Sequence, residues 1–521
     1  MSYRGATSSN IFATSAGFLS KFARAIPPSS HLKHPAQDEN TQHPNCPTPT
    51  NTSPAKTPPQ QHSYRQQIPQ TQPINDKPLD AMTTPNVSSP HVTHTVNQAP
   101  APRLYATTTA LPPTDGPTHL HNALRDADPR TTLAWIRDGN GLIAHGRATT
   151  ITTHGHSRFT DANTWWQTIT NNATIDNDIQ APGTGLIAFG SFAYSPHSPH
   201  GATLIVPEHI TGTHNGISWH TTITTTPTTP TPPPPAPPIT EPGPATYTPG
   251  TLTETTWTDR VTQAIDAITN GHLDKVVLAR DEHITTPHPI DPRWLLTQLT
   301  NSYPHTWVFA IDGLIGATPE MLIRLHNNTA TSRILAGTIR RTGNTTTDTN
   351  LASTLTHSPK DLHEHAYAVT SVTDVLQPHC HTLSVPETPF VLDLPNVMHL
   401  ATDVTGHTNT NINVLELAEQ LHPSAAVCGT PRTTADNLIN TLEGMDRGRY
   451  AGPIGWIDSH GDGEFGIALR CGHLDATHTN MRIFAGCGIV DASDPTAELN
   501  ESHAKLLPMK NAFTPPQDAH P

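Results

Sequence analysis

Hydrophobic and polar positions alternate with two different periods between residues 251 and 509. Apolar residues recur every three or four positions in some segments, as in amphipathic helices, and every second position in others, as in strands. The predicted helices cover residues 257–270, 292–302, 360–376, 414–421, 433–442 and 495–507. The predicted strands cover residues 275–280, 307–311, 315–317, 321–325, 333–340, 391–394, 397–404, 452–458, 464–471 and 481–490. Because hairpins occur beside crossovers, the pattern predicts an α+β (mixed α/β) fold with much antiparallel sheet.

Sparser strand-like runs precede this region, with one helical segment among them. The strand-like runs cover residues 132–136, 141–146, 185–190 and 202–207, and the helical segment lies around 162–169. Residues 1–102 show almost no apolar periodicity, so we expect a disordered, low-complexity extension. A Pro/Thr-rich stretch at 221–250 predicts a linker or long loop, and a tail follows at 511–521. The linker need not separate its flanking parts in space, because a long insertion costs little closure entropy.

Composition narrows the possible functions. The 521 residues include 29 Lys and Arg against 43 Asp and Glu, a net charge of −14, whereas a nucleic-acid-binding protein needs a basic surface. No apolar run approaches the roughly 18 residues that a membrane span needs. The five cysteines are odd in number and include no Cys-x-x-Cys pair, which argues against a disulfide framework or zinc ribbon. Reduced thiols in a cytoplasmic enzyme are the simpler interpretation.

The N-terminal segment has a composition of its own. Its first 30 residues are basic, rich in serine and free of acids, which matches the composition of an organellar transit peptide. The alternative is an unstructured tail, or a start upstream of the true initiator, for which Met82 is a candidate. We therefore expect a cytoplasmic protein, with organellar targeting as the alternative.

Two elements near the C-terminus are candidates for binding an anion. If residues 464–471 form one strand, alternation places Arg470 on a face shared with small residues, which leaves room for an anionic ligand. Arginine can bind such a ligand through two parallel hydrogen bonds, although an edge-strand salt bridge is the alternative. Gly486 and Gly488 follow in the next strand and let the backbone approach a ligand, although glycines also mark tight packing.

Two pairs of acidic residues have helical spacing. Asp361 and Glu364 lie three positions apart in one predicted helix, and Glu498 and Glu501 repeat this spacing in another. Neither pair has a matching Lys or Arg beside it in the sequence. The four carboxylates could share a hard divalent cation such as Mg²⁺, whereas two solvated helix faces are the alternative.

Two further residues are candidates for moving protons. Lys275 lies among apolar neighbours on its strand, where burial would lower its pKa towards the range of a general base. The alternative is a lysine at the end of a strand that reaches water. Glu320 follows a proline at a predicted corner between two strands, where it could donate a proton or serve only as a turn residue.

Taken in order, eight blocks of this sequence resemble the chorismate-utilising enzymes, and among these the isochorismate synthases. The blocks are DKVVLAR at 274–280, GATPE at 316–320, LAGT at 335–338, KDLHEH at 360–365, HPSAAVCGTP at 422–431, YAGPIGW at 450–456, GEFGIALR at 463–470, and AGCGIV at 485–490 with the two glutamates that follow. The resemblance implies a two-layer β-sandwich with helices packed outside and the active site between the layers. Residues 251–510 would form the chorismate-binding catalytic domain, and 103–220 the N-terminal part of the same fold.

Particular positions within these blocks bear on the subtype. Family members that deliver ammonia usually carry glutamine at the position of Lys275, so the lysine favours water as the nucleophile. Ala426 resembles the plain isomerases, because anthranilate, aminodeoxychorismate and salicylate synthases tend to have threonine there. Ser424, Ala425 and Cys428 depart from the commonest isochorismate synthase pattern, which has Thr, Pro and Gly.

The resemblance also implies a mechanism and a set of ligands. Water deprotonated by Lys275 would attack C2 of chorismate while Glu320 protonates the departing C4 hydroxyl. Mg²⁺ would be held by Glu364 and Glu501, with Asp361 and Glu498 orienting ligands or metal-bound water. The implied substrate-binding residues are Ala336, Gly337, Thr338, His399, Ala426, Tyr450, Arg470, Ala485, Gly486, Gly488 and Lys505.

The leading interpretation is therefore an isomerase that converts chorismate to isochorismate for menaquinone or catechol siderophore synthesis. The alternatives are a salicylate synthase, component I of an anthranilate or aminodeoxychorismate synthase, and a degenerate, non-enzymatic binding or scaffold protein. Chorismate is the expected substrate, without nucleic acid, membrane or glutaminase subunit as a partner, and we expect a monomer.

Overall fold

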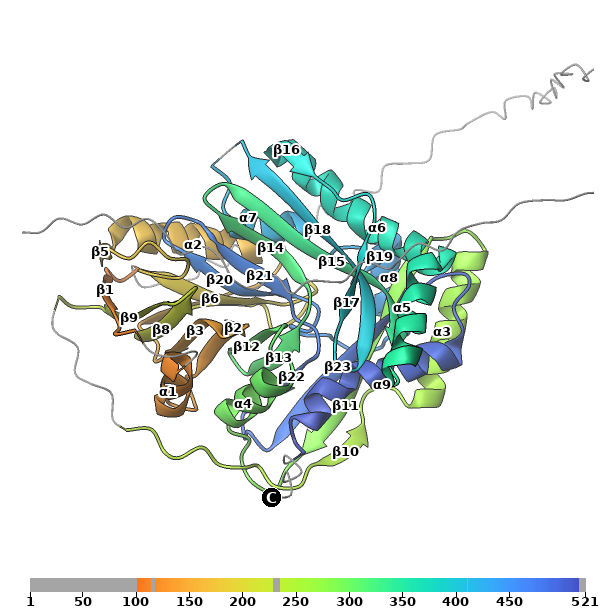
Figure 1. Cartoon of the computed structure of the whole chain (residues 1–521), viewed down its shortest axis with the longest axis horizontal. Coiled ribbons are helices and arrows are strands. Elements are labelled where there is room, and N and C mark those ends of the chain that lie inside the picture. Colours follow the sequence, from red (N-terminus) through yellow and green to blue (C-terminus); the bar gives the residue numbers. More distant parts are fainter. Residues whose placement is uncertain (1–100, 114–117, 228–234, 410, 515–521) are drawn as a thin grey trace, which may run out of the picture. The chain divides into compact units, whose positions relative to one another are not determined.

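The computed structural model describes residues 101–113, 118–227, 235–409 and 411–514. The expected extension 1–102, with any targeting segment in it, lies outside the described residues apart from positions 101 and 102. Strand pairing in the described residues is antiparallel, except that β1 and β5 run parallel. The fold is α+β, as the sequence predicts, and its strands form two large sheets (Figure 1).

The larger sheet has thirteen strands among the described residues. Their spatial order is β10 (Thr246–Pro249), β11 (Lys275–Thr285), β23 (Asn480–Ile489), β22 (Cys471–Leu474), β13 (Leu314–Thr318), β12 (Trp307–Ile311), β2 (Leu133–Arg137), β3 (Asn140–His145), β8 (His209–His214), β9 (Ile217–Thr224), β1 (Tyr105–Ala110) and β5 (Thr174–Asp176), with β19 (Gly429–Thr430) beside β11. Strands from after the Pro/Thr-rich stretch form one half of this sheet and strands from before it form the other half, and the two halves join where β12 pairs with β2.

The smaller sheet has ten strands among the described residues. Their order is β16 (Cys380–Ser384), β18 (Val397–Thr408), β15 (Thr329–Arg340), β14 (Met321–His326), β21 (Gly463–Ile467), β20 (Pro453–Asp458), β6 (Ile187–Phe192), β7 (Ala202–Val206) and β4 (Thr149–Thr153), with β17 (Phe390–Asp393) beside β18. This sheet is also built from both parts of the chain, because β20 pairs with β6.

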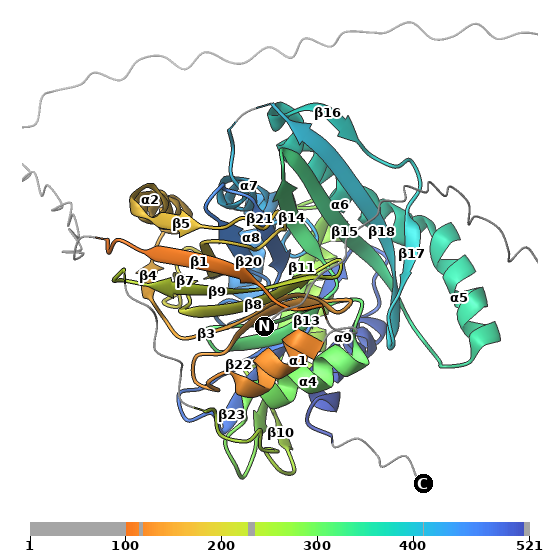
Figure 2. The same ribbon diagram turned by 60° about the vertical axis from the view of Figure 1, so that its left-hand side comes forward.

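Helices cover the two sheets on the outside (Figure 2). They are α1 (Thr118–Asp126), α2 (Arg158–Asn172), α3 (Glu254–Thr269), α4 (Pro292–Ser302), α5 (Thr345–His357), α6 (Pro359–Leu376), α7 (Val414–Leu421), α8 (Arg432–Leu442) and α9 (Pro495–Asn511), with a short 3₁₀ helix at Gln377–His379. The main core contains buried residues of both sheets, such as Trp135 of β2 and Phe189 of β6, and a second core packs α1, α4 and α9 on the larger sheet. No helix in the described ranges is long and apolar enough to cross a membrane.

Several predicted boundaries differ from the structure, and three of these differences change the description of a segment. The single strand expected at 464–471 is two strands, because Arg470 has a positive φ of 50° and interrupts the extended backbone. The stretch expected as a linker at 221–250 contributes the end of β9 and all of β10, since its threonines can pair in a sheet. The expected tail at 511–521 begins inside α9 and the second core, where Phe513 is buried.

Candidate active site

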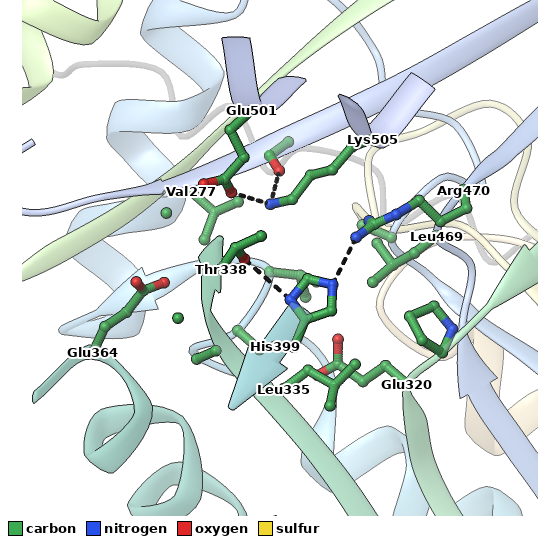
Figure 3. Close-up of a pocket in the computed structure, with 18 of the residues that line it drawn as sticks. Val277, Glu320, Leu335, Thr338, Glu364, His399, Leu469, Arg470, Glu501 and Lys505 are labelled. Carbon is green, nitrogen blue, oxygen red and sulfur yellow. Dashed lines mark hydrogen bonds and ion pairs between the residues drawn. The ribbon is translucent and has the colours of Figure 1, made fainter. Parts of the chain in front are cut away.

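One pocket gathers most of the residues that the sequence singles out. It lies between β11 and β23 of the larger sheet and β15 and β18 of the smaller sheet, beside α6 and α9 (Figure 3). The predicted site residues that line it are Glu320, Ala336, Gly337, Thr338, Glu364, His399, Ala426, Tyr450, Arg470, Gly486, Gly488, Glu501 and Lys505. Residues far apart in the sequence therefore converge on one cavity.

The remaining predicted site residues lie behind this lining. Lys275 is completely buried and contacts Glu364, while Asp361 packs against the backbone of Gly337. Glu498 is close to Glu501. Ala485 belongs to the second core, so its side chain faces away from the pocket and only its backbone remains available to a ligand.

Lys275 and Glu364 form an ion pair at the edge of the pocket. Lys275 begins β11, and its Nζ lies 3.0 Å from Oε1 of Glu364, which α6 supplies from the opposite side. Burial disfavours the charged form of Glu364, but the nearby Lys275 outweighs it and the pKa of Glu364 lies below its usual value. The carboxylate is therefore ionised at neutral pH and directed at the lysine amine.

Glu320 sits at the corner between β13 and β14, as its position after a proline predicts. Its backbone N–H donates to the Thr318 hydroxyl at 3.3 Å, which fixes this corner. Burial raises the pKa of Glu320 to about 7, although a backbone hydrogen bond and the charge of Lys275 act in the opposite direction. A carboxyl with this pKa can hold a proton near neutral pH and release it to a ligand.

A hydrogen-bonded chain crosses the pocket from Arg470 to Thr338. His399 Nε2 lies 3.1 Å from Nη2 of Arg470, and His399 Nδ1 lies 3.0 Å from the Thr338 hydroxyl (Figure 3). Because a guanidinium can only donate, Nε2 must accept, and a neutral imidazole then carries its proton on Nδ1. Burial and the charge of Arg470 keep the pKa of His399 well below its usual value, in agreement with a neutral ring. The Thr338 oxygen therefore accepts from His399, and its own proton is available to a ligand.

Arg470 reaches the pocket in a different way from the one predicted. It lies between β21 and β22 with a left-handed backbone, so strand alternation does not set its direction, and Leu469 lines the same pocket. Its guanidinium is buried beside Tyr450, whose pKa burial raises above its usual value. A buried guanidinium with a protonated phenol nearby suits an anionic group on a ligand.

The predicted absence of cations beside the acidic pairs is wrong. Glu501 lies 2.5 Å from Lys505 one helical turn away, and Glu498 lies 3.4 Å from Lys360, which precedes Asp361 in α6. The sequence could not predict Lys360 as the partner of Glu498, because the two residues lie on different helices. The acids nevertheless remain electrostatically crowded around the pocket.

This crowding fits a divalent cation. Burial, and next the charge of Glu501, raise the pKa of Glu498 to about 7. Burial also raises the pKa of Asp361, with further contributions from Glu364 and Glu501. The candidate ligand atoms of Cys487, Glu498 and Glu501 lie within 4.8 Å of one another. A cation beside Glu498 and Glu501 would relieve their repulsion, and their oxygen atoms suit a hard ion. Glu364, the other predicted ligand, is not in this group and pairs with Lys275.

Several pocket residues escaped the sequence analysis. They are Val277, Pro319, Leu335, Val427, Arg447, Ala451 and Leu469. Most are apolar, and an apolar residue in a strand carries no signal that separates a pocket wall from the core. Arg447 had one possible signal, since it lies four residues after Glu443, a spacing that permits an ion pair on a helical turn.

The family to which this chain belongs follows from a sequence comparison. The profile of the family described as "Chorismate binding enzyme" matches residues 91–514, which include both sheets and the whole pocket. The chain is therefore a member of the chorismate-binding enzyme family.

Several relatives in this family are named for the same activity. Isochorismate synthase DhbC of Bacillus subtilis is 38% identical over 265 residues, covering 49% of this chain and 66% of that protein. Isochorismate synthase MenF of Bacillus subtilis is 36% identical over 261 residues, covering 49% of this chain and 55% of that protein. These alignments thus span about two thirds or less of the relatives' lengths.

A solved structure extends the likeness to the fold. The crystal structure of the putative 2,3-dihydroxybenzoate-specific isochorismate synthase DhbC from Bacillus anthracis matches with a TM-score of 0.63 and 32% identity. The match covers 75% of this chain and 98% of that one.

Proposed function

We propose that this protein is an isochorismate synthase, which isomerises chorismate by adding water at C2 and removing the C4 hydroxyl. The observation that carries the proposal is a pocket lined by the buried carboxyl of Glu320 and by Glu364, with the buried amine of Lys275 behind this lining at 3.0 Å from Glu364, in a chorismate-binding enzyme. The charge of Lys275 is one of the influences that lower the pKa of Glu320 against the effect of burial. Relatives named isochorismate synthase support the assignment.

The proposed chemistry needs one base and one acid. Lys275 pairs with the ionised Glu364 in the free protein, so its amine must first release a proton to solvent. The neutral amine then takes a proton from water as the new C2–O bond forms. Both ring double bonds shift, the C4–O bond breaks, and Glu320 gives its proton to the leaving oxygen, so that hydroxide does not depart as a free anion. After the reaction Lys275 gives the proton it has taken up to solvent, and Glu320 takes one back from solvent. Both groups thus return to their starting protonation states.

The proposed substrate contacts use the polar groups of the pocket. Chorismate carries two carboxylates, and we assign the side-chain carboxylate to Arg470, Tyr450 and the backbone N–H groups around Gly486 and Gly488. Lys505 adds a second buried cation, which also donates to the Gly486 carbonyl at 2.9 Å. The other proposed contacts, around the ring and the leaving hydroxyl, are Ala336, Gly337, Thr338, His399, Ala426 and the backbone of Ala485.

We further propose that Mg²⁺ is the cofactor. Glu364 and Glu501 would hold it, and Asp361 and Glu498 would orient these ligands or metal-bound water. When bound, the cation would neutralise the ring carboxylate of the substrate and so let a dianion enter a protein of net charge −14.

Product identification tests this function. Purified protein incubated with chorismate and Mg²⁺ should give an isomer of unchanged mass that separates from chorismate by liquid chromatography. Pyruvate together with fluorescent salicylate would show a salicylate synthase, and anthranilate in the presence of ammonia would show the amine-forming chemistry. Either of these results, or the absence of turnover, would contradict the proposal.

The resemblance to isochorismate synthases also bears on the assembly and location of the protein and on the fate of its product. We propose that the enzyme is monomeric and cytoplasmic. It should need no glutaminase subunit, because Lys275 favours water over ammonia as the nucleophile. Its product would enter menaquinone or catechol siderophore synthesis.

Gly488→Ala should weaken binding of Mg²⁺. A Cβ at this position would lie 2.4 Å from Oε1 of Glu364 and 3.1 Å from Cε of Lys275, so the carboxylate must move. We expect Mg²⁺ affinity, measured by isothermal titration calorimetry, to fall by about 10- to 100-fold. In the control Gly216→Ala, the Cβ meets open space but the backbone has a φ of 84°, so stability should fall while Mg²⁺ affinity is unchanged. Equal Mg²⁺ affinity in Gly488→Ala and the native protein would refute the assignment of Glu364.

A further inference from the structure

Part of one edge of β11 is completed by side chains in place of a strand, and one of them is Trp257, whose Nε1 donates to the Ala279 carbonyl at 3.2 Å. β19 pairs with residues 275–276 of β11 and β10 pairs with residues 282–285, which leaves a gap between them on this edge in the described chain. In this gap the Ala279 N–H donates to Oε1 of Glu443 at 2.7 Å. The Val277 carbonyl accepts from Nη2 of Arg447 at 2.8 Å. Glu443 and Arg447 thus supply the acceptor and the donor that a neighbouring strand would provide.

These two side chains form a buried, two-point ion pair. Arg447 Nε donates to Oε2 of Glu443 at 2.9 Å, and Arg447 Nη2 lies 2.5 Å from Oε1. Both side chains are 2% exposed. The ring of Tyr194 covers the guanidinium at 4.3 Å, which excludes water from that face.

Arg447 also joins β11 to two other walls of the pocket. Its Nη1 donates at 2.9 Å to the carbonyl of Val427, which follows Ala426 in the pocket lining. Its own carbonyl accepts from the N–H of Tyr450 at 3.1 Å, at the turn that presents the phenol to the pocket. The guanidinium of Arg447 therefore connects the strand that begins with Lys275 to the segment of Ala426, and its backbone carbonyl adds the turn of Tyr450.

We propose that Glu443 and Arg447 are positioning residues, which fix the strand carrying Lys275 against the other walls of the pocket. The inference rests on the proposed function, because it assigns these residues to the placement of the proposed base. Most N–H groups of Arg447 are already used within the protein, which leaves Arg470 and Lys505 as the cations for a ligand.

The test compares Arg447→Lys with a matched control, Arg449→Lys. A lysine at 447 keeps the charge but cannot bind Glu443, Val277 and Val427 at once. Arg449 is also buried, but it pairs with Asp312 and does not line the pocket. With chorismate and saturating Mg²⁺, kcat/KM of Arg447→Lys should fall by about 10- to 100-fold, because the base is misplaced, whereas the control should keep the native value.

The pH profile separates positioning from a simple loss of folded protein. If β11 moves, the burial and the charges around Glu320 change, so the alkaline limb of kcat/KM, which reports the ionisation of Glu320, should shift in Arg447→Lys. A smaller folded fraction would lower the whole profile without moving this limb. An unmoved limb in Arg447→Lys would overturn the proposal, whatever the loss of rate.

Hydrogen–deuterium exchange provides a second measurement that needs no substrate. Both Arg447→Lys and Glu443→Gln should accelerate exchange in the peptide that covers residues 275–280, relative to native protein and to Arg449→Lys. Unchanged exchange in both variants would refute the positioning role. If native protein does not convert chorismate while the exchange result holds, the proposed function fails and the structural role of the pair stands.

Discussion

Lys275→Ala is expected to reduce kcat by about 10²- to 10⁴-fold, the usual contribution of a positioned acid or base. The side chain is fully buried, its amine lies 3.0 Å from Glu364, and it shares the pocket region with Glu320. Truncation removes the proposed base and leaves Glu364 without its ion-pair partner. Steady-state kinetics with chorismate and Mg²⁺ measures the effect, and circular dichroism should show an unchanged fold.

A second lysine serves as the control for charge. Lys510 in α9 pairs with Glu282 at 2.5 Å and lies outside the pocket lining, so Lys510→Ala should keep native kcat and KM. Native turnover in Lys275→Ala would show that another group takes the proton from water. The proposed mechanism would then be wrong even if the product is isochorismate.

Glu320→Gln is expected to lower kcat by a similar factor of about 10²- to 10⁴-fold. Glutamine has nearly the same shape but cannot give a proton to the leaving hydroxyl. In the native protein the acid must be protonated, and burial raises the pKa of Glu320 to about 7. Therefore kcat/KM of the native enzyme should decline as the pH rises through about 7. Full activity in Glu320→Gln would exclude Glu320 as the acid.

Stability provides a control for this variant. The pKa of Glu320 in the folded protein, about 7, lies above the value of about 4.3 for a free glutamate, so the unfolded chain binds fewer protons between these values. The native protein therefore loses stability from this group as the pH rises through that range. Glu320→Gln does not ionise, so at pH 8 its melting temperature should equal or exceed the native one.

The sequence predicted the class of fold and most of the pocket, for reasons that differ between residues. Asp494 caps α9 and Pro495 opens it, as local sequence rules predict, and this fixes the face that carries Glu498 and Glu501. Lys275 was predicted as a candidate because it lies among apolar residues of a strand. Glu320 was predicted because it follows a proline at a corner between two strands. Both signals are local in the sequence. Their joint placement around one cavity came from the family resemblance and not from spacing.

Long-range contacts account for what the sequence did not predict. Arg470 interrupts a run that reads as one strand, because its left-handed backbone depends on tertiary packing and not on local preference. Lys360 pairs with Glu498, 138 positions away, so no sequence window contains both. The gap in β11 that Glu443 and Arg447 complete is likewise visible only when both edges of the strand are known.

Each sheet joins strands from both parts of the chain, and this has a consequence for cutting the chain. β2 pairs with β12 in one sheet and β6 pairs with β20 in the other, so residues 103–220 supply the neighbours of strands that lead to the catalytic pocket. A fragment without these residues would expose unpaired backbone N–H and C=O groups on the edge strands of both sheets. Exposed strand edges of this kind promote aggregation. The parts of the chain before and after the Pro/Thr-rich stretch therefore fold as one cooperative unit. We expect that residues 251–510 expressed alone do not fold.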